Sequence, residues 1–562
     1  MIYHGITSKN FLHSPFDLYG IATVLVTVGF VMHGPVQRLL KTLALLAGII
    51  AFVGGPRPVM ANPKELIAKK PTLSTKDKKE ALHEICEATA RNGYFSGVVL
   101  VAENGQVIYR KAFGLANREW EIPNSIETKF RLASVSKQFC SMIVMQLIQD
   151  GKLNLNDSIT NYLPSYRQDT GERVTIHHLL AHQSGIPDFT SSFDYRNTTA
   201  RLLFEKDDFI KRFCSGDLTH NPGELYSYSN AGYVILGRII EKVTKKSYDH
   251  NLRDRITQPL GMANTGYDSP HELLTKRACG YTHGPFRVQN APYIEMNPAP
   301  GAAGAIYSTV DDLFAWDRAL ATDKLLKENL RDLMFTPNTS VPECQAAGGR
   351  QHSNYGYGWR IYNVIHPTTQ EKTCVINHGG AISGFRALVN RIPSRNAFVA
   401  LLCNQGDPPG SNAVWLTLNR MNTEIIHVVT EQPYKIPQNP PRSQDQRLYQ
   451  LVCSKGVDTA ISWLEEKGKK NPWGGSFATA ASELLRSGKL KEAIRLYEYD
   501  ILQTPNKVWL YRKLADTYIQ SGQLEKAANI VGQALTIRPG DERLIGLQNE
   551  IRYSFSPKSP RP

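Results

Sequence analysis

A 34-residue period near the C-terminus constrains the fold of this chain more than any other feature of its sequence. The period links Gly488 to Gly522, Ala493 to Ala527, and Pro505 to Pro539. A more degenerate unit precedes these residues, with Gly456, Ala460, Leu464 and Pro472. A period of this length is typical of repeat domains, in which one unit cannot bury its apolar face alone, so about three units must stack. We therefore expect stacked repeats over residues 443–553, capped by residues 542–551.

The chain of 562 residues is too long to form one core, because single cores stop growing at about 250–300 residues. A proline-rich stretch (PYKIPQNPP) predicts an extended linker, which we place at residues 431–442. Residues 62–430 are then left for a second folded domain. The end of the chain, residues 554–562, has the sequence SFSPKSPRP and is expected to be a disordered tail.

Charge and cysteine usage argue against two classes of protein. The net charge of +14 favours anionic surfaces, but no basic run is interleaved with aromatic residues, so we expect no binding to nucleic acid. The eight cysteines are scattered and form no C-x-x-C pair, which argues against a zinc or redox site. The spacing of the cysteines leaves the disulfide pattern open.

Residues 1–61 have the pattern of an export signal. Arg38 and Lys41 precede an apolar stretch at residues 42–53, which has the length of a signal-peptide core. Small residues then follow at Val59-Met60-Ala61, as cleavage by signal peptidase requires. This order predicts export, with the mature protein periplasmic or secreted.

A second apolar run, at residues 18–31, leaves the fate of the N-terminus open. The true start is either Met1 or Met32, with the upstream residues an extension in the second case. Each run is shorter than the roughly 20 apolar residues that span a bilayer. The alternative to cleavage is a retained anchor that associates with a membrane through residues 18–55.

Ser134 and Lys137 form the first pair of residues with a predicted chemical role. A hairpin is expected around Asn104-Gly105, and an apolar-periodic helix from Ser134 to Gly151. The lysine then lies about one helical turn from the serine, on the same face. A partly desolvated amine at that place lowers the barrier to removing the serine proton. By itself the pair is weak evidence, since S-x-x-K also arises by chance and a serine at a helix start is often an N-cap.

Tyr228 and Asn230 form the second candidate pair, two residues apart in a predicted loop that enters a helix. A tyrosine with a depressed pKa can shuttle a proton from the serine to a leaving group. The asparagine amide can hold the lysine and a substrate carbonyl. An aromatic core residue beside a helix cap is an equally good interpretation of the pair in isolation.

His378, Gly380 and Ala381 form the third candidate group, after a β-like run at residues 372–376. Glycines at a strand edge let a substrate backbone lie against the strand. The N–H of Ala381 can then pair with the N–H of Ser134 as an oxyanion hole. Singly, a glycine-rich turn with an incidental histidine explains the group as well.

In this order the three groups resemble the motifs of the serine β-lactamases, D,D-peptidases and related esterases, nearest the class C branch. The motifs S-x-x-K, Y-x-N and H-x-G fall at Ser134/Lys137, Tyr228/Asn230 and His378/Gly380. Connecting stretches at residues 151–157, 175–185, 259–262 and 301–304 are also similar to the family, and we assign no chemistry to them. The resemblance covers roughly residues 75–430.

The resemblance implies an α+β fold for this domain and acyl transfer as its reaction. The expected fold is a mostly antiparallel sheet flanked by helices, with a helical subdomain inserted between the first and last strands and Ser134 at the floor of the site. Ser134 attacks a carbonyl to form an acyl-enzyme, while Lys137 and Tyr228 move protons. No metal or organic cofactor is needed. The substrate and oxyanion are held by Asn230, His378, Gly380 and Ala381.

One departure from the family pattern bears on the substrate. Penicillin-hydrolysing members commonly have Lys-Thr-Gly where this chain has His378-Gly379-Gly380. Lysine provides a permanent cation for a substrate carboxylate, whereas histidine is mostly neutral at pH 7. Arg386 could replace that cation, although a surface role is the commoner fate of such an arginine. An ester, an amide or a D-amino-acid peptide is therefore at least as well supported as a β-lactam.

The C-terminal period resembles that of tetratricopeptide repeats, so an all-α repeat domain is expected to follow the hydrolase. Such arrays bind peptides or proteins, or pack against their own chain, and both alternatives stay open. The leading interpretation is an exported hydrolase acting on a small ester, amide or peptide. The alternatives are a penicillin-binding D,D-peptidase acting on cell-wall peptides, or a non-catalytic binding protein acting through its repeats. The presence of all three motifs argues against the last.

Overall fold

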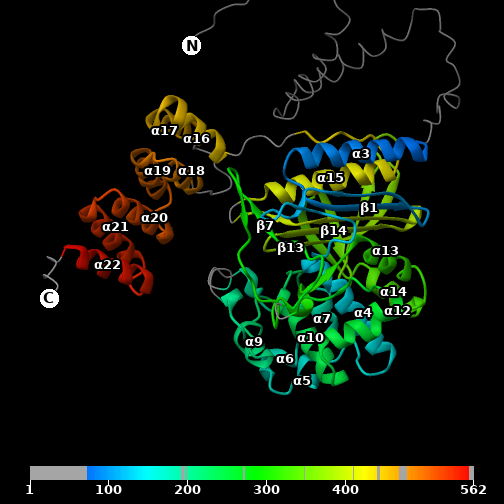
Figure 1. The fold of residues 1–562 in the computed structure, drawn as a ribbon. Helices are drawn as coiled ribbons and strands as arrows, with labels where there is room; N and C mark the ends of the chain where they lie inside the picture. The colour runs from blue at the N-terminus through cyan, green and yellow to red at the C-terminus, as the bar shows by residue number, and fades with distance from the viewer. Residues whose placement is uncertain are drawn as a thin grey trace, which may run out of the picture. The chain divides into compact units, whose positions relative to one another are not determined.

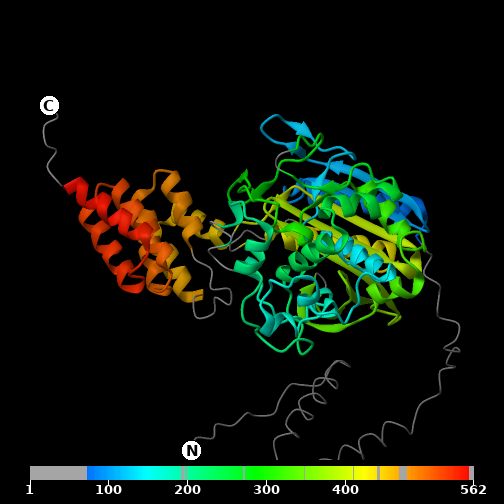
Figure 2. The same ribbon diagram turned by 90° about the horizontal axis from the view of Figure 1, so that it is seen from below.

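The computed structural model describes most of residues 73–562 (Figures 1 and 2). The residues left out of the description are 1–72, 192–194, 196–198, 270–271, 347–348, 409–410, 439–443, 468–476 and 556–562. The predicted export signal in residues 1–61 lies outside the described residues. Within the described part of the chain, no helix combines the length and the apolar character needed to cross a bilayer.

An eight-stranded antiparallel sheet forms the centre of the first domain, in the order β10-β11-β12-β13-β14-β15-β1-β2. The strands are β1 (Gly97–Glu103), β2 (Gln106–Phe113), β10 (Thr339–Ala346), β11 (Gly349–Tyr355), β12 (Arg360–Ile365), β13 (Lys372–Ile382), β14 (Phe385–Ile392) and β15 (Ala397–Cys403). The predicted hairpin is confirmed, because Asn104 and Gly105 join β1 to β2 with φ values of 52° and 73°. Pairing of β1 with β15 closes the domain and confirms the expected fold class.

Helices cover both faces of this sheet. Val99 of β1 packs in one core with α3 (Thr75–Arg91) and α15 (Ala413–Val429), which Figure 1 shows together on one face. Val98 points to the other face and packs with helices of the segment between β2 and β10. Because successive side chains of a strand face opposite sides, β1 and β15 are apolar along almost their whole length.

The segment between β2 and β10 is the predicted helical subdomain. Its helical elements are η1 (Ala133–Ser136), α4 (Lys137–Gln149), α5 (Ile159–Tyr162), α6 (Gln168–Gly171), α7 (Ile176–Leu180), η2 (Phe189–Ser191), η3 (Thr199–Arg201), α9 (Lys206–Phe213), α10 (Asn230–Thr244), α11 (Tyr248–Leu252), η4 (Arg253–Thr257), α12 (Gln258–Leu260), η5 (Gly301–Ala303), α13 (Val310–Ala319) and α14 (Glu328–Phe335). Short strands lie among them or at the domain edge: β3 (Leu115–Asn117), β4 (Ile122–Pro123), β5 (Phe130–Arg131), β6 (Gly266–Tyr267), β7 (Tyr281–His283), β8 (Val288–Asn290), β9 (Ile306–Ser308) and β16 (Gln405–Gly406). A last 3-10 turn, η6 (Pro393–Arg395), joins β14 to β15. Helices α4 and α10 contact each other at the centre of this segment, so their N-terminal residues, Lys137 and Asn230, can meet.

The C-terminal domain is all-α, as the 34-residue period predicted, and is coloured orange to red in Figures 1 and 2. Its helices are α16 (Gln444–Lys455), α17 (Val457–Lys467), α18 (Ala478–Arg486), α19 (Leu490–Gln503), α20 (Val508–Gln520), α21 (Leu524–Ile537) and α22 (Glu542–Phe555). Gly456, Gly488 and Gly522 join the helices of each pair with φ of 86°, 76° and 73°, a left-handed conformation that favours glycine. The repeating Ala493 and Ala527 are fully buried, which explains why small residues recur there.

The first helix of the C-terminal domain begins at Gln444, and the last ends at Phe555. Residues 431–438 of the proline-rich stretch form neither helix nor strand, and the rest of the linker lies outside the described residues. The last helix, α22, continues to Phe555, past Ser554 where the disordered tail was predicted to begin. The apolar face of α22, with Leu544 and Ile551 buried in the repeat core, carries the helix beyond the point that composition suggested.

Candidate active site

Ser134 lies in the 3-10 turn η1, directly before α4. The sequence predicted that Ser134 would begin the α-helix, but the α-helix begins at Lys137 and Ser136 precedes it. The residue before the serine, Ala133, has a φ of 50°, a left-handed conformation that costs a residue with a Cβ about 1–2 kcal/mol. Such strain is typical of functional sites, and here it presents a half-buried Ser134 at the end of the helix.

Lys137 is fully buried and has three polar neighbours. Its Nζ lies 3.2 Å from Ser134 Oγ, and it donates to Asn230 Oδ1 at 2.8 Å and to the Ala303 carbonyl at 2.9 Å. Burial lowers the pKa of Lys137 to about 7, against the opposing effect of the Asp188 charge. A neutral amine has two N–H groups and one lone pair. Because two carbonyl oxygens take the N–H groups, the lone pair is left for the Ser134 hydroxyl.

Tyr228 lies beside the same pair of residues. The Lys137 Nζ is 4.9 Å from the centre of the tyrosine ring, and the Tyr228 hydroxyl is hydrogen-bonded to Ser134. Burial raises the pKa of Tyr228 above its ordinary value of 10, despite the opposing effect of its hydrogen bond with Ser134. The depressed pKa that we expected for this tyrosine is therefore wrong. Tyr228 keeps its proton at neutral pH, so it can act as a proton donor and not as the resting base.

Asn230 is the first residue of α10, so the predicted loop entering a helix is confirmed. Its side chain connects two parts of the site. The Oδ1 atom accepts from Lys137, and the Nδ2 atom donates to both carboxylate oxygens of Asp188 at 3.2 and 3.3 Å. A further hydrogen bond from Nδ2 to Thr190 Oγ1 measures 3.2 Å.

His378, Gly380 and Ala381 lie within β13, whereas the sequence placed them after the strand. A Cβ at Gly380 would lie 2.0 Å from the Leu132 carbonyl oxygen and 3.2 Å from the Ala133 Cβ. Only glycine therefore lets β13 come this close to the turn that carries Ser134.

Ala381 lies where the edge of β13 is open. Strand β12 pairs with β13 only over residues 372–377, and Ile382 and Phe385 close a two-residue turn to β14. Hydrogen-bonded and non-hydrogen-bonded pairs alternate along an antiparallel ladder. Counting from the closing pair, Ala381 falls at a position whose N–H points away from β14. This register supports the predicted oxyanion role of the Ala381 N–H.

His378 is held by its neighbours and does not supply a cation. The Nδ1 atom is 2.7 Å from the Gly379 carbonyl and therefore carries the proton, so Nε2 accepts from the Tyr355 hydroxyl at 2.9 Å. Burial lowers the pKa of His378 to about 3, with Lys137 acting in the same direction. Arg386, the alternative cation, is mostly buried and pairs with Asp407 at 3.0 Å.

Four residues that sequence reasoning missed complete the site. They are His182, whose ring lies 4.2 Å from that of Tyr228, together with Ala303, Asp188 and Tyr355. His182 and Ala303 belong to the stretches 175–185 and 301–304, to which we assigned no chemistry. The similarity of these two stretches to the family could have indicated that they contribute residues to the site. Asp188 and Tyr355 had no such signal, because they reach the site only through the fold.

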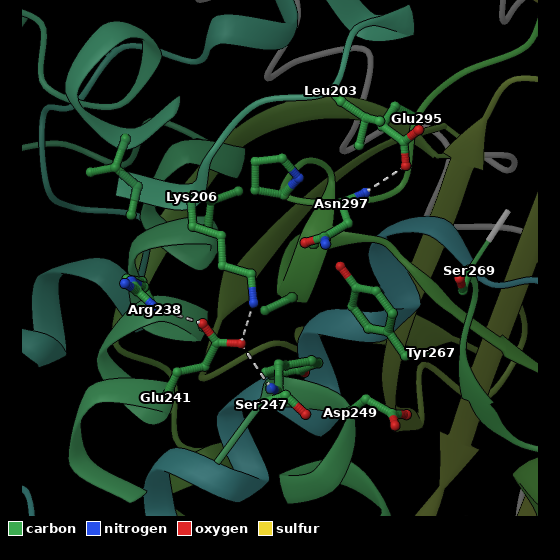
Figure 3. A pocket seen from close by; sticks show the side chains of 17 residues that line it. Leu203, Lys206, Arg238, Glu241, Ser247, Asp249, Tyr267, Ser269, Glu295 and Asn297 are labelled. Atoms are coloured by element: carbon green, nitrogen blue, oxygen red, sulfur yellow. Dashed lines mark hydrogen bonds and ion pairs between the residues drawn. The ribbon is translucent and has the colours of Figure 1, made fainter. Parts of the chain in front are cut away.

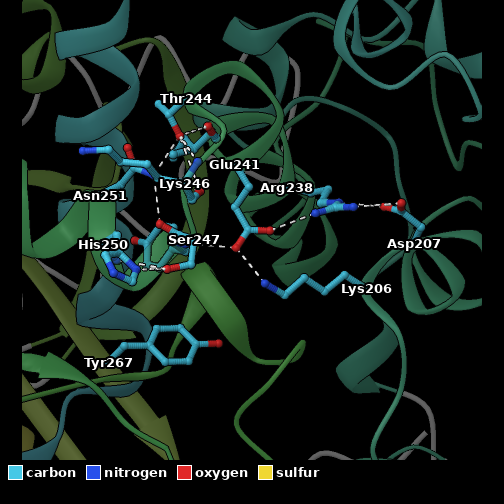
Figure 4. Close-up of polar contacts among 12 residues, drawn as sticks. Lys206, Asp207, Arg238, Glu241, Thr244, Lys246, Ser247, His250, Asn251 and Tyr267 are labelled. Atoms are coloured by element: carbon cyan, nitrogen blue, oxygen red, sulfur yellow. Dashed lines mark hydrogen bonds and ion pairs between the residues drawn. The ribbon is translucent and has the colours of Figure 1, made fainter.

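A separate cavity lies along α10 and is lined by none of the predicted site residues (Figure 3). Its volume is about 230 Å³, and its lining includes Val234, Gly237, Tyr248 and Ala302. Glu241 accepts there from Lys206 Nζ at 2.7 Å, Arg238 Nη1 at 3.1 Å and the Tyr248 N–H at 2.9 Å (Figure 4). Asp207 also pairs with Arg238, so the charges compensate one another and the network holds α9, α10 and α11 together.

Metal ligands and disulfides do not contribute to the described part of the site. No group of three or more His, Cys, Asp or Glu side chains among the described residues is suited to a metal ion. Each cysteine whose surroundings are described is a free thiol.

A serine with a buried lysine one turn away, on an antiparallel sheet with an inserted helical subdomain, defines a serine hydrolase that works through an acyl-enzyme. The chain belongs to the β-lactamase family, whose model matches residues 83–420. A tetratricopeptide repeat model matches residues 484–551, within the domain of stacked helices.

Proteins similar to this chain include penicillin-binding proteins and an amidase by name. Penicillin-binding protein 4* of Bacillus subtilis (strain 168) is 28% identical over 400 residues, which cover 68% of this chain and 81% of the relative. A penicillin binding protein from Bacillus halodurans matches with 25% identity and a TM-score of 0.51, over 61% of this chain and 98% of that one. The D-amino acid amidase of Ochrobactrum anthropi SV3, complexed with D-phenylalanine, matches with 25% identity and a TM-score of 0.52, over 63% of this chain and 98% of that one.

Proposed function

We propose that this protein is an exported serine hydrolase that forms an acyl-enzyme at Ser134 and cleaves an ester, an amide or a D-amino-acid peptide bond. The observation that carries this proposal is the environment of Lys137. Its Nζ has two carbonyl acceptors and lies 3.2 Å from Ser134 Oγ. A buried amine with a pKa of about 7 is a suitable general base for that hydroxyl near neutral pH.

The proposed reaction uses only groups of this chain. Neutral Lys137 takes the proton of Ser134 as Oγ attacks the substrate carbonyl, and the resulting oxyanion is bound by the N–H groups of Ser134 and Ala381. Tyr228 then gives its proton to the leaving group and is reprotonated by Lys137, so the carbon–heteroatom bond breaks and the acyl-enzyme remains. Water then attacks the carbonyl of the acyl-enzyme, and the groups that gave and took protons during acylation exchange these roles, so that the acyl group is released and Ser134 is regenerated.

The neutral state of His378 supports a substrate that needs no cation at this position. Its two ring nitrogens are engaged by Tyr355 and by the Gly379 carbonyl, so the histidine offers no charge to a carboxylate. This arrangement favours esters, amides and D-amino-acid derivatives over β-lactams. The similar amidase, complexed with D-phenylalanine, supports the same choice.

The second candidate is a penicillin-binding D,D-peptidase that acts on cell-wall peptides. Its support is the similarity to penicillin-binding protein 4* over 68% of this chain. A non-catalytic protein that acts through its repeats is less well supported, because Ser134, Lys137 and Tyr228 are all present and adjacent.

Hydrolysis of a short-chain p-nitrophenyl ester by the full chain, beside the Ser134→Ala variant, tests the proposal. We expect turnover that the substitution abolishes, and equal turnover in both proteins would refute Ser134 as the nucleophile. Incubation with fluorescent penicillin separates the two candidates. A long-lived adduct on Ser134 supports the peptidase, whereas rapid ester or D-amino-acid amide turnover without an adduct supports the hydrolase.

Export and the role of the repeats are separate parts of the proposal. The support for export is the charged and apolar pattern of residues 32–61, with cleavage after Ala61 as the expected result. Mass spectrometry of the protein from periplasmic and medium fractions gives its mature N-terminus, and an intact N-terminus in the membrane fraction would support the anchor. The repeats are proposed to bind a peptide or protein partner, as arrays of this kind commonly do.

A further inference from the structure

Asp188 contacts the N-terminus of α10, and no step of the proposed reaction uses it. It follows α7 in a loop, and its carboxylate faces the first residue of α10. Its Oδ1 accepts from the Asn230 backbone N–H at 3.2 Å and from Nδ2 at 3.2 Å. Its Oδ2 accepts from Asn230 Nδ2 at 3.3 Å and from Thr190 Oγ1 at 2.6 Å. The carboxylate thus lies at the N-terminus of a 15-residue helix, where the helix dipole favours negative charge.

This arrangement permits only one orientation of the Asn230 amide. Both carboxylate oxygens of Asp188 can only accept hydrogen bonds. Thr190 Oγ1 gives its proton to Asp188, so it too faces Asn230 as an acceptor. Every group on that side of the amide therefore requires the NH₂ end, and the carbonyl oxygen must point to Lys137.

The orientation of the amide decides what Lys137 can do. With Oδ1 toward Nζ, the amine uses its N–H groups on Asn230 and on the Ala303 carbonyl, and its lone pair points to Ser134 Oγ. With the amide reversed, Nδ2 would be the neighbour of Nζ. The lysine lone pair would then accept from the amide and be lost to the serine.

We propose that Asp188 is a positioning residue for acyl transfer, whose carboxylate fixes the Asn230 amide and thereby directs the lone pair of Lys137 at Ser134. This inference rests on the proposed function, since it assumes that Lys137 is the base. It assigns a role to a residue that the three sequence motifs do not include.

The charge of Asp188 has a second effect on the same lysine. The other titratable groups around Lys137 are uncharged: burial lowers the pKa of His182 and of His378, and raises the pKa of Cys140, Tyr228 and Tyr233. Arg360, which acts on Tyr228 and His378, is a positive charge nearby. Among its neighbours, Asp188 does most to raise the pKa of Lys137 against burial, which leaves that pKa at about 7.

Two substitutions separate the orienting effect from the charge. Asp188→Asn keeps an oxygen that can accept from Asn230 Nδ2 but removes the charge, whereas Asp188→Ala removes both. Asp217→Asn is the matched control, because this aspartate is exposed and pairs with Arg167 away from the site. Each full-length protein is compared in kcat and KM for a p-nitrophenyl ester between pH 5 and 9, with its thermal unfolding midpoint.

For Asp188→Ala we expect kcat to fall about 100-fold with KM within about threefold, since a misplacement of about 1 Å costs that much. For Asp188→Asn we expect a smaller fall, and the acid limb of the pH profile should move to lower pH because the lysine loses its counter-charge. Asp188→Glu should restore part of the rate lost in Asp188→Ala. Folded variants with kcat within threefold of the parent and an unmoved acid limb would overturn the inference.

A direct titration of Lys137 keeps the test independent of the choice of substrate. If the parent turns over the ester no faster than Ser134→Ala, the proposed function fails for that substrate, and the rates say nothing about Asp188. NMR of protein labelled with [¹³Cε]lysine, with the Lys137 signal identified from Lys137→Arg, then decides the inference. A lower midpoint in Asp188→Asn than in the parent supports it, and an equal midpoint overturns it.

Discussion

Replacing Gly380 with alanine tests how closely β13 must approach the turn that carries Ser134. The added Cβ would lie 2.0 Å from the Leu132 carbonyl oxygen, whereas a close carbon–oxygen contact measures about 3.3 Å. The neighbour is backbone and cannot rotate away. The strand and the turn must therefore separate by about 1.3 Å, the difference between those two distances.

This separation would widen the space between the N–H groups of Ser134 and Ala381. Loss of one oxyanion donor lowers kcat by about 100- to 1000-fold, or about 3–4 kcal/mol. We expect Gly380→Ala to lower kcat by that factor and to change KM much less, because the oxyanion forms only during the reaction. The assay is p-nitrophenyl ester hydrolysis by the full chain, followed by stopped-flow detection of the acylation burst.

Gly532→Ala provides the matched control for the same chemical change. Nothing lies within 4 Å of a Cβ at Gly532, which is within helix α21 of the repeats. This substitution should leave kcat unchanged and raise the free energy of unfolding by about 0.5–1 kcal/mol, because alanine is the better helix former. A Gly380→Ala protein that unfolds at the parent's temperature and keeps kcat within threefold would refute the close approach of β13 as a requirement for catalysis.

The structure leads to three further predictions. The value of kcat/KM should rise as pH increases through about 7, because burial lowers the pKa of Lys137 to about 7 and only the neutral amine accepts the serine proton. A profile that is flat from pH 5 to 9 would contradict this assignment. His378→Phe should lower the free energy of unfolding by about 1–3 kcal/mol in urea titrations, since the buried Tyr355 hydroxyl loses its acceptor, and an unchanged midpoint would show that the hydroxyl finds another partner. Glu241→Ala should lower the free energy of unfolding by about 2 kcal/mol. This is less than the cost of removing a fully buried ion-pair partner, because Lys206 is 35% exposed. Equal stability of variant and parent would show that the network contributes nothing.

Local patterns in the sequence were sufficient to predict several parts of this structure. The Asn104-Gly105 hairpin, the loop that leads into α10 and the helical repeats depend on residues close together in the chain. The proximity of Ser134 and Lys137 is also local, since one helical turn separates them in either a 3-10 or an α conformation. These predictions succeeded because turn chemistry and helical periodicity act over a few residues.

The electrostatic state of the site depended on the tertiary structure. Burial by distant segments brings the pKa of Lys137 to about 7 and raises that of Tyr228, which reversed our expectation for the tyrosine. Desolvation depends on everything packed around a group, so it has no local signature in the sequence.

Long-range pairing also decided which groups meet. The Ala303 carbonyl, at the end of η5, contacts Lys137, and Asp188, in the loop after α7, contacts Asn230. Tyr355 reaches His378 across β12. The sequence alone predicted the nucleophile and its lysine and indicated the two domain types, because each of these predictions rests on a short pattern or a regular period. Only the tertiary structure decided which atom of Lys137 faces which partner, because hydrogen-bond direction is set by residues that are far apart in the chain and close together in the fold.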